Sequence, residues 1–199
     1  MNALLAVAGF VFVAAITPGP NNLVVMRMAM CTGVSRALPA IAGVVAGGMV
    51  LLGLATAGLG RLAAADARIR SGVMMVGCCY LAWLGASLIV RSFRTPAAGL
   101  SSKASPAGAA GLFAFQFLNP KGWAMVMTAA STIGSGRGGV DFASLAVIFI
   151  VIPAICLLLW SSLGALLARH LARNAVRRRF DRGMGALLVG SALLLLIEG

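Results

Sequence analysis

The six residues TPGPNN, at positions 17–22, interrupt the first apolar run of the chain, between AVAGFVFVAAI and LVVMRMAM. Proline removes a backbone N–H and its ring clashes with the preceding turn, which costs about 3 kcal/mol in a helix interior. Proline is well suited, however, to the first position of a new helix, directly after a residue such as Asn, Gly or Thr. We therefore predict that one helix ends here and another begins, at Pro20 after Gly19 or at Pro18 after Thr17.

The rest of the sequence has the composition of an integral membrane protein. Of its 199 residues, 61% are hydrophobic and 10% are charged, whereas soluble domains carry about 25% charged residues. The net charge of +12 would suggest a nucleic-acid partner in a soluble protein. Here the basic residues lie in short connections between apolar segments, where they determine topology. We expect a lipid bilayer as the environment and no nucleic-acid partner.

Six apolar segments have about the length that crosses a bilayer, at residues 3–29, 38–60, 72–90, 108–133, 142–167 and 183–198. The first, third and fifth connections hold 11 basic residues, against 4 in the second and fourth. Basic loops remain in the cytoplasm, so both termini are predicted to face the periplasm. The predicted fold class is all-α, a polytopic membrane protein with one transmembrane domain over residues 1–199.

The fourth span contains a second interruption of the same kind, LNPKG at positions 118–122. Spans one and four are the first members of two three-helix halves, and a duplicated unit of three helices must insert upside down. Broken helices at corresponding positions of inverted repeats are the best sequence indicator of a transporter's binding site. We predict two inverted repeats, at about residues 1–92 and 106–199, joined by a linker at about residues 93–105.

The two breaks supply the chemistry that a small zwitterion requires. The free N–H groups that begin each new half-helix favour a carboxylate, and the carbonyls that end the preceding half-helix favour an ammonium group. Lys121 is the one basic residue deep in a span. It either attracts an anionic group or has a structural role, reaching an interface or backbone carbonyls. The predicted substrate-binding residues are Pro18, Gly19, Pro20, Asn21, Asn22, Gln116, Asn119, Pro120 and Lys121.

Two other functions remain as alternatives, a membrane thiol-disulfide electron shuttle and a heavy-metal exporter. The four cysteines lie outside both breaks and are predicted to pack as small apolar residues. One histidine and no acid near the middle of a span make a metal site difficult to build. The four acids are predicted to lie in loops or at span ends, and the glycines of spans two and six to allow close helix packing. We predict no enzyme activity, no catalytic residue, no cofactor and no metal.

The segments TPGPNNLVVMRMAMCTGVSRALPAIAGVVAGG and FLNPKGWAMVMTAAS together resemble the signature of the LysE/RhtB family of amino-acid exporters. The matching motif positions are Pro18, Gly19, Pro20 and Asn21, then Asn119, Pro120 and Lys121. The resemblance covers essentially the whole chain. It implies export of amino acids or close derivatives across the bacterial inner membrane, driven by the proton motive force.

Within that family, TPGPNN and a fourth span rich in alanine and methionine are similar to the cysteine/O-acetylserine efflux subgroup. A coupling proton would require a titratable group, for which Asp141 and Lys121 are the candidates in the sequence. A homo-oligomer is left open.

Overall fold

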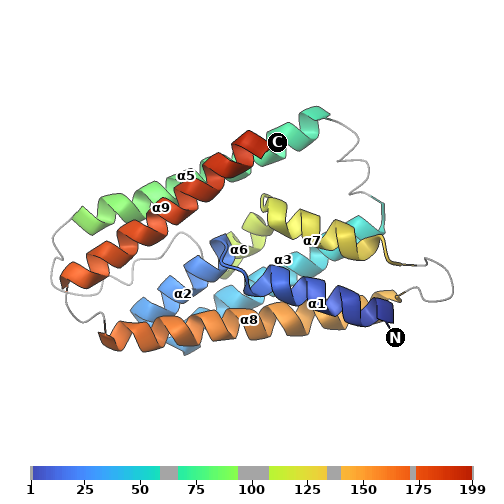
Figure 1. Cartoon of the computed structure of the whole chain (residues 1–199), viewed down its shortest axis with the longest axis horizontal. Coiled ribbons are helices and arrows are strands. Elements are labelled where there is room, and N and C mark those ends of the chain that lie inside the picture. The colour runs from blue at the N-terminus through green and yellow to red at the C-terminus, as the bar shows by residue number, and fades with distance from the viewer. Residues whose placement is uncertain (1, 59–66, 94–107, 134–139, 171–173, 199) are drawn as a thin grey trace.

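The computed structural model describes residues 2–58, 67–93, 108–133, 140–170 and 174–198 (Figure 1). Within these ranges the chain is helical, apart from an isolated bridge between Ile133 and Val140. The helices are α1 (Asn2–Ile16), α2 (Pro20–Thr32), α3 (Val34–Thr56), α5 (Ala67–Phe93), α6 (Ala109–Gln116), α7 (Pro120–Ala130), α8 (Phe142–His170) and α9 (Asn174–Glu198). The all-α prediction is confirmed.

Both predicted breaks divide an apolar run into two helices. The first new helix, α2, begins at Pro20 after Gly19, and the second, α7, begins at Pro120 after Asn119. The alternative start at Pro18 is wrong. Proline occupies the first helical position in both cases, because the N–H that it lacks would have no intrahelical partner there.

Among the described residues, two helices are long and apolar enough to cross a membrane singly, Val34–Thr56 and Phe142–Ala168. The pair Ala3–Ile16 and Pro20–Thr32 qualifies as one broken span, bent by 54° at its break. The arrangement of six spans in two inverted repeats therefore stays a prediction. The predicted linker between the repeats lies almost wholly outside the described residues.

The helices form two groups (Figure 1). Helices α5 and α9 lie side by side and make their main contacts with each other. In the second group, the long helices α3 and α8 contact each other and hold the broken helices. Helix α8 contacts α1 and α2, while α3 contacts α6 and α7. The two breaks are thus fixed between α3 and α8.

Glycines let several helices approach to backbone contact. A Cβ atom built on Gly43 of α3 would lie 2.2 Å from the carbonyl oxygen of Ala109, and one on Gly164 of α8 would lie 2.1 Å from that of Met26. Gly85 and Gly185 meet in the same way between α5 and α9. The packing role predicted for glycines is confirmed at Gly43 and Gly185.

We expect Gly164→Ala to lower the free energy of unfolding by about 1–3 kcal/mol, since the added methyl group overpacks the contact between α8 and α2. Gly53→Ala is the matched control, because a Cβ atom at Gly53 meets nothing within 4 Å. Thermal unfolding of the detergent-purified variants measures both. Equal stability of the two variants would contradict the close approach of α8 to α2.

Buried apolar side chains form two clusters along the bundle. The first cluster is built from α2, the first half of α3, α5, α6, α9 and Leu157 of α8. The second cluster is built from α1, the second half of α3, α7 and the first part of α8. Each broken helix therefore contributes one half to each cluster, and the breaks lie at the level between them.

An ion pair connects the two groups of helices. Arg27 Nε of α2 donates a hydrogen bond to Asp181 Oδ1 of α9 at 3.0 Å, and the two side chains are 17% and 11% exposed. Asp181 was predicted to lie in a loop or at a span end, and Arg27 to serve as a topology determinant. Asp181 lies within α9, which begins at Asn174, and it is the buried partner of Arg27; its position at a span end stays a prediction.

Candidate functional site

The first break is held by side chains that satisfy the carbonyl groups at the end of α1. Asn22 Nδ2 donates to the carbonyl oxygens of Ala15 at 2.8 Å and of Thr17 at 2.9 Å. Trp160 Nε1 of α8 donates to that of Ile16 at 3.1 Å. These carbonyls were expected to be free for an ammonium group. That expectation is wrong, because the chain supplies their donors itself.

Lys121 connects the two breaks. Its Nζ donates to the carbonyl oxygen of Thr17 at 3.0 Å, reaching from the start of α7 to the end of α1. A Cβ atom built on Gly19 would lie 3.3 Å from this Nζ, so the glycine gives the lysine room. The structural role considered for Lys121, a hydrogen bond to a backbone carbonyl, is thus present in the structure. Lys121 also places a cation between the two breaks, as the binding role requires.

The second break is organised by Gln116, the last residue of α6. Its Oε1 accepts hydrogen bonds from Asn21 Nδ2 and Asn119 Nδ2, both at 3.1 Å. Its Nε2 donates to the carbonyl oxygen of Val44 on α3 at 3.2 Å. One buried amide side chain therefore joins α2, α3 and the second break.

The N-termini of α2 and α7 are not capped by side chains. The first intrahelical bonds run from Leu23 N to the Gly19 carbonyl and from Trp123 N to the Asn119 carbonyl. The backbone N–H groups before these bonds are donors that a helix leaves without intrahelical partners. Asn119 is the residue directly before α7, but its side chain donates to Gln116 and does not cap the helix. Both helix starts are therefore available to an anion.

One buried acceptor at the site lacks a partner. Asn21 Oδ1 is inaccessible to solvent and accepts no hydrogen bond; among the described residues, Tyr80 Oη is the other buried side-chain atom in this condition. An unsatisfied buried acceptor costs about 1–3 kcal/mol. A bound donor would remove that cost at Asn21.

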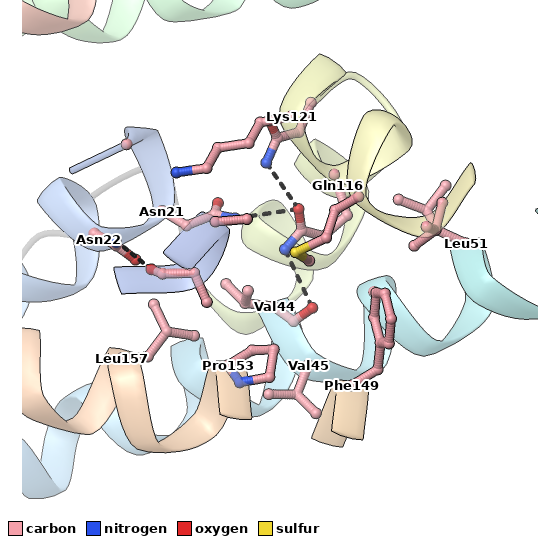
Figure 2. Close-up of a pocket in the computed structure, with 18 of the residues that line it drawn as sticks. Asn21, Asn22, Val44, Val45, Leu51, Gln116, Lys121, Phe149, Pro153 and Leu157 are labelled. Carbon is pink, nitrogen blue, oxygen red and sulfur yellow. Dashed lines mark hydrogen bonds between the residues drawn. The ribbon is translucent and has the colours of Figure 1, made fainter. Parts of the chain in front are cut away.

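A cavity of about 70 Å³ lies at the breaks. Figure 2 shows Asn21, Gln116 and Lys121 above it and Val45, Pro153 and Leu157 below it. Of the nine predicted binding residues, Pro18 and Pro120 do not line it. The other seven do, namely Gly19, Pro20, Asn21, Asn22, Gln116, Asn119 and Lys121. Their role in binding stays a prediction.

The apolar walls of the cavity come from α3 and α8, which the sequence interpretation did not assign to the site. Val44, Gly48 and Leu51 follow the spacing i, i+4, i+7 on α3. Phe149, Pro153 and Leu157 follow the spacing i, i+4, i+8 on α8. Residues at this spacing lie on one face of a helix. A glycine and a proline within apolar spans, Gly48 and Pro153, were the sequence signal that could have indicated that these two faces line a cavity.

Among the described residues, Lys121 is the one charged residue that lines the cavity, and none of the four cysteines lines it. In the described part of the chain, no three His, Cys, Asp or Glu residues are grouped so that they could hold a metal ion. Asp141 lies outside the cavity, just before α8, where its Oδ2 accepts a hydrogen bond from Ser144 N. Hydrogen bonds from Ser144 hold the pKa of Asp141 below its ordinary value, so this carboxyl stays ionised at neutral pH.

A bundle of apolar helices with a polar cavity at two broken helices is the architecture of a membrane transporter. The chain belongs to the family described as LysE type translocator, whose model matches residues 12–199. The predicted family is confirmed.

Curated relatives of this chain carry the names of amino-acid efflux proteins. A cysteine/O-acetylserine efflux protein of Klebsiella pneumoniae is 29% identical over 95% of this chain and 94% of its own length. Its namesake in Salmonella typhimurium is 30% identical over 62% of this chain and 61% of its own length. A leucine efflux protein of Klebsiella pneumoniae is 32% identical over 55% of this chain and 51% of its own length. No solved structure matches the chain.

Proposed function

We propose that the protein exports small neutral amino acids, or close derivatives of them, from the cytoplasm across the bacterial inner membrane. The observation that carries this proposal is the pairing, at one cavity, of a cation and uncapped helix N-termini with a buried acceptor that lacks a donor. These are the complements of a carboxylate and an ammonium group. The efflux proteins among the relatives support the direction of transport.

The carboxylate of the substrate binds at the starts of α2 and α7. Uncapped N–H groups and the positive ends of the helix dipoles favour an anion at such positions. Lys121 Nζ donates to the neutral carbonyl oxygen of Thr17. A carboxylate is a stronger acceptor for an ammonium group than a neutral carbonyl. Lys121 therefore exchanges Thr17 for the substrate, while Asn22 continues to satisfy the Thr17 carbonyl.

The ammonium group of the substrate is proposed to donate to Asn21 Oδ1; this oxygen is closed to solvent, so the side chains around it must move for the substrate to reach it. This atom is positioned by the bond from Asn21 Nδ2 to Gln116, which fixes the amide with its oxygen unpaired. The carbonyls at the end of α1 already accept other donors. Asn21 thus takes the role that the sequence assigned to backbone carbonyls.

The charges at the cavity support a neutral side chain on the substrate. No acidic residue in the described part of the chain lines the cavity, so a basic side chain would be buried without a partner. Its one cation is needed for the α-carboxylate, which leaves none for an acidic side chain. A cavity of about 70 Å³ corresponds to roughly five to seven water-sized positions, and alanine, serine and cysteine are of this size.

We also propose that the two halves are inverted repeats. In this arrangement α1, α2, α3 and α5 correspond to α6, α7, α8 and α9. The contacts of α8 with α1 and α2 then correspond to those of α3 with α6 and α7, and both sets of contacts are present. The contacts between α3 and α8, and between α5 and α9, map onto themselves. In Figure 1, α1 and α2 run from right to left whereas α7 runs from left to right, as inversion requires. The first and last described turns lie toward the same end, which supports both termini lying on the same side of the membrane; that this side is the periplasm rests on the basic loops alone.

Export is proposed to be driven by the proton motive force, as the family resemblance implies. We expect an ionophore that collapses the proton gradient to abolish accumulation of the exported amino acid outside cells. Export should continue when the sodium gradient alone is removed. Unchanged export after collapse of the proton gradient would contradict proton coupling.

The function itself is tested by metabolite profiling of the medium of cells that overexpress the protein. We expect neutral amino acids of the size of alanine, serine or cysteine to rise, and basic or acidic ones to stay unchanged. A variant with serine at all four cysteine positions should export equally, whereas a thiol-disulfide shuttle would lose its activity. Raised metal tolerance without amino-acid export would favour the metal exporter and contradict the proposal.

A further inference from the structure

One end of the cavity is closed by two fully packed side chains. Leu51 of α3 is 0% exposed and Phe149 of α8 is 2% exposed. Both side chains line the cavity, and both belong to the second apolar cluster, which α1, α3, α7 and α8 build. Figure 2 places them together, at the end away from Asn22. Buried side chains at native packing density give way only at a cost. This end of the cavity is therefore a fixed apolar wall.

Gly48 lies on the same face of α3 as Leu51 and also lines the cavity. A Cβ atom built on Gly48 meets nothing within 4 Å, whereas one on Gly47 would lie 2.7 Å from Gln116 Cγ. Gly47 is thus required for the approach of α3 to α6, and Gly48 is not required for helix packing. The missing side chain of Gly48 leaves space that a ligand can occupy.

We infer that Gly48, Leu51 and Phe149 determine the size of the side chain that the substrate carries; this inference rests on the proposed function. With the carboxylate and ammonium groups bound near Lys121 and Asn21, the side chain extends toward the apolar wall. Short uncharged side chains fit before Leu51 and Phe149, and longer ones such as that of leucine do not.

The test is transport of an equimolar mixture of alanine and leucine by wild-type and variant protein in proteoliposomes. Wild-type protein is expected to prefer alanine. Phe149→Ala opens the wall and should raise the leucine-to-alanine ratio by roughly tenfold or more, which is the discrimination that a few methylene groups provide in an apolar pocket. Ile148→Ala is the matched control, since Ile148 is buried in the same cluster without lining the cavity.

A substitution in the opposite sense keeps the test informative if Phe149→Ala does not fold. Gly48→Val adds a side chain to the cavity, starting from a Cβ position that meets nothing within 4 Å, and should shift preference from cysteine to glycine by about tenfold. Gly53→Val is its control, on the same helix with the same open surroundings but away from the cavity. Ratios that change in the two cavity variants and not in the two controls support the inference.

Wild-type ratios in both cavity variants, at normal protein levels, would overturn the inference and leave the proposed function standing. Equal shifts in a cavity variant and its control would overturn it as well. A wild-type protein that transports none of these amino acids would instead overturn the proposed function, and the inference with it.

Discussion

Replacing Lys121 with methionine is expected to reduce amino-acid export by roughly 10- to 100-fold. Lys121 is the one cation at the cavity, and hydrogen bonds to charged groups contribute about 1.5–3 kcal/mol. Methionine keeps the length of the side chain and removes the charge. The Thr17 carbonyl still accepts a hydrogen bond from Asn22 in this variant, so the break at the end of α1 should persist.

The control for Lys121→Met is Arg36→Met. Arg36 is an exposed residue of α3 that does not line the cavity. The measurement is the initial rate of efflux from preloaded proteoliposomes, normalised to the amount of protein. Equal losses in both variants would point to a general effect of positive charge and would contradict a role of Lys121 in binding. An unchanged efflux rate in Lys121→Met would contradict a role of Lys121 in binding directly.

The largest effect on stability is expected at the ion pair between Arg27 and Asp181. Replacing Asp181 alone with alanine should lower the free energy of unfolding by about 3 kcal/mol, because Arg27, whose side chain is 17% exposed, is left largely desolvated without its partner. Replacing both residues, as Arg27→Met with Asp181→Leu, should restore most of this loss, since an apolar pair of similar volume avoids the cost of desolvating two charges.

Thermal unfolding of the detergent-purified variants tests this double substitution. Arg179→Ala provides the control, as an exposed charge on the same helix as Asp181. If Asp181→Ala were as stable as Arg179→Ala, the pair would not tie α9 to α2. A double variant less stable than either single one would show that the charges themselves are required for the contact.

The positions of both breaks could be predicted from the sequence because their signals are local. Pro20 and Pro120 lack the N–H that a helix interior requires, and after Gly19 and Asn119 they fit the first position of a new helix. Proline alone is not sufficient, because Pro39 and Pro153 lie inside α3 and α8. The same reasoning located seven of the nine proposed binding residues at one cavity. Pro18 and Pro120 share the motifs but not the cavity, since a motif does not say which of its residues face a ligand.

The remaining features of the site depend on contacts between distant segments. Trp160 satisfies the Ile16 carbonyl across 144 positions of sequence, and Arg27 meets Asp181 across 154. No local pattern distinguishes such residues from interface anchors or topology determinants. The walls from α3 and α8 were missed for a related reason, because an apolar helix face in a membrane protein can meet lipid, another helix or a cavity alike.

The proposed function requires that a zwitterion binds between the two breaks, with its ammonium group at Asn21. Equilibrium binding of radiolabelled alanine to the purified protein tests it most directly, with Asn21→Leu compared against Thr56→Val, which lies away from the cavity. We predict that Asn21→Leu weakens binding by roughly tenfold or more, the equivalent of one charge-assisted hydrogen bond, and that Thr56→Val binds as the wild type does. Wild-type affinity in Asn21→Leu would contradict the claim.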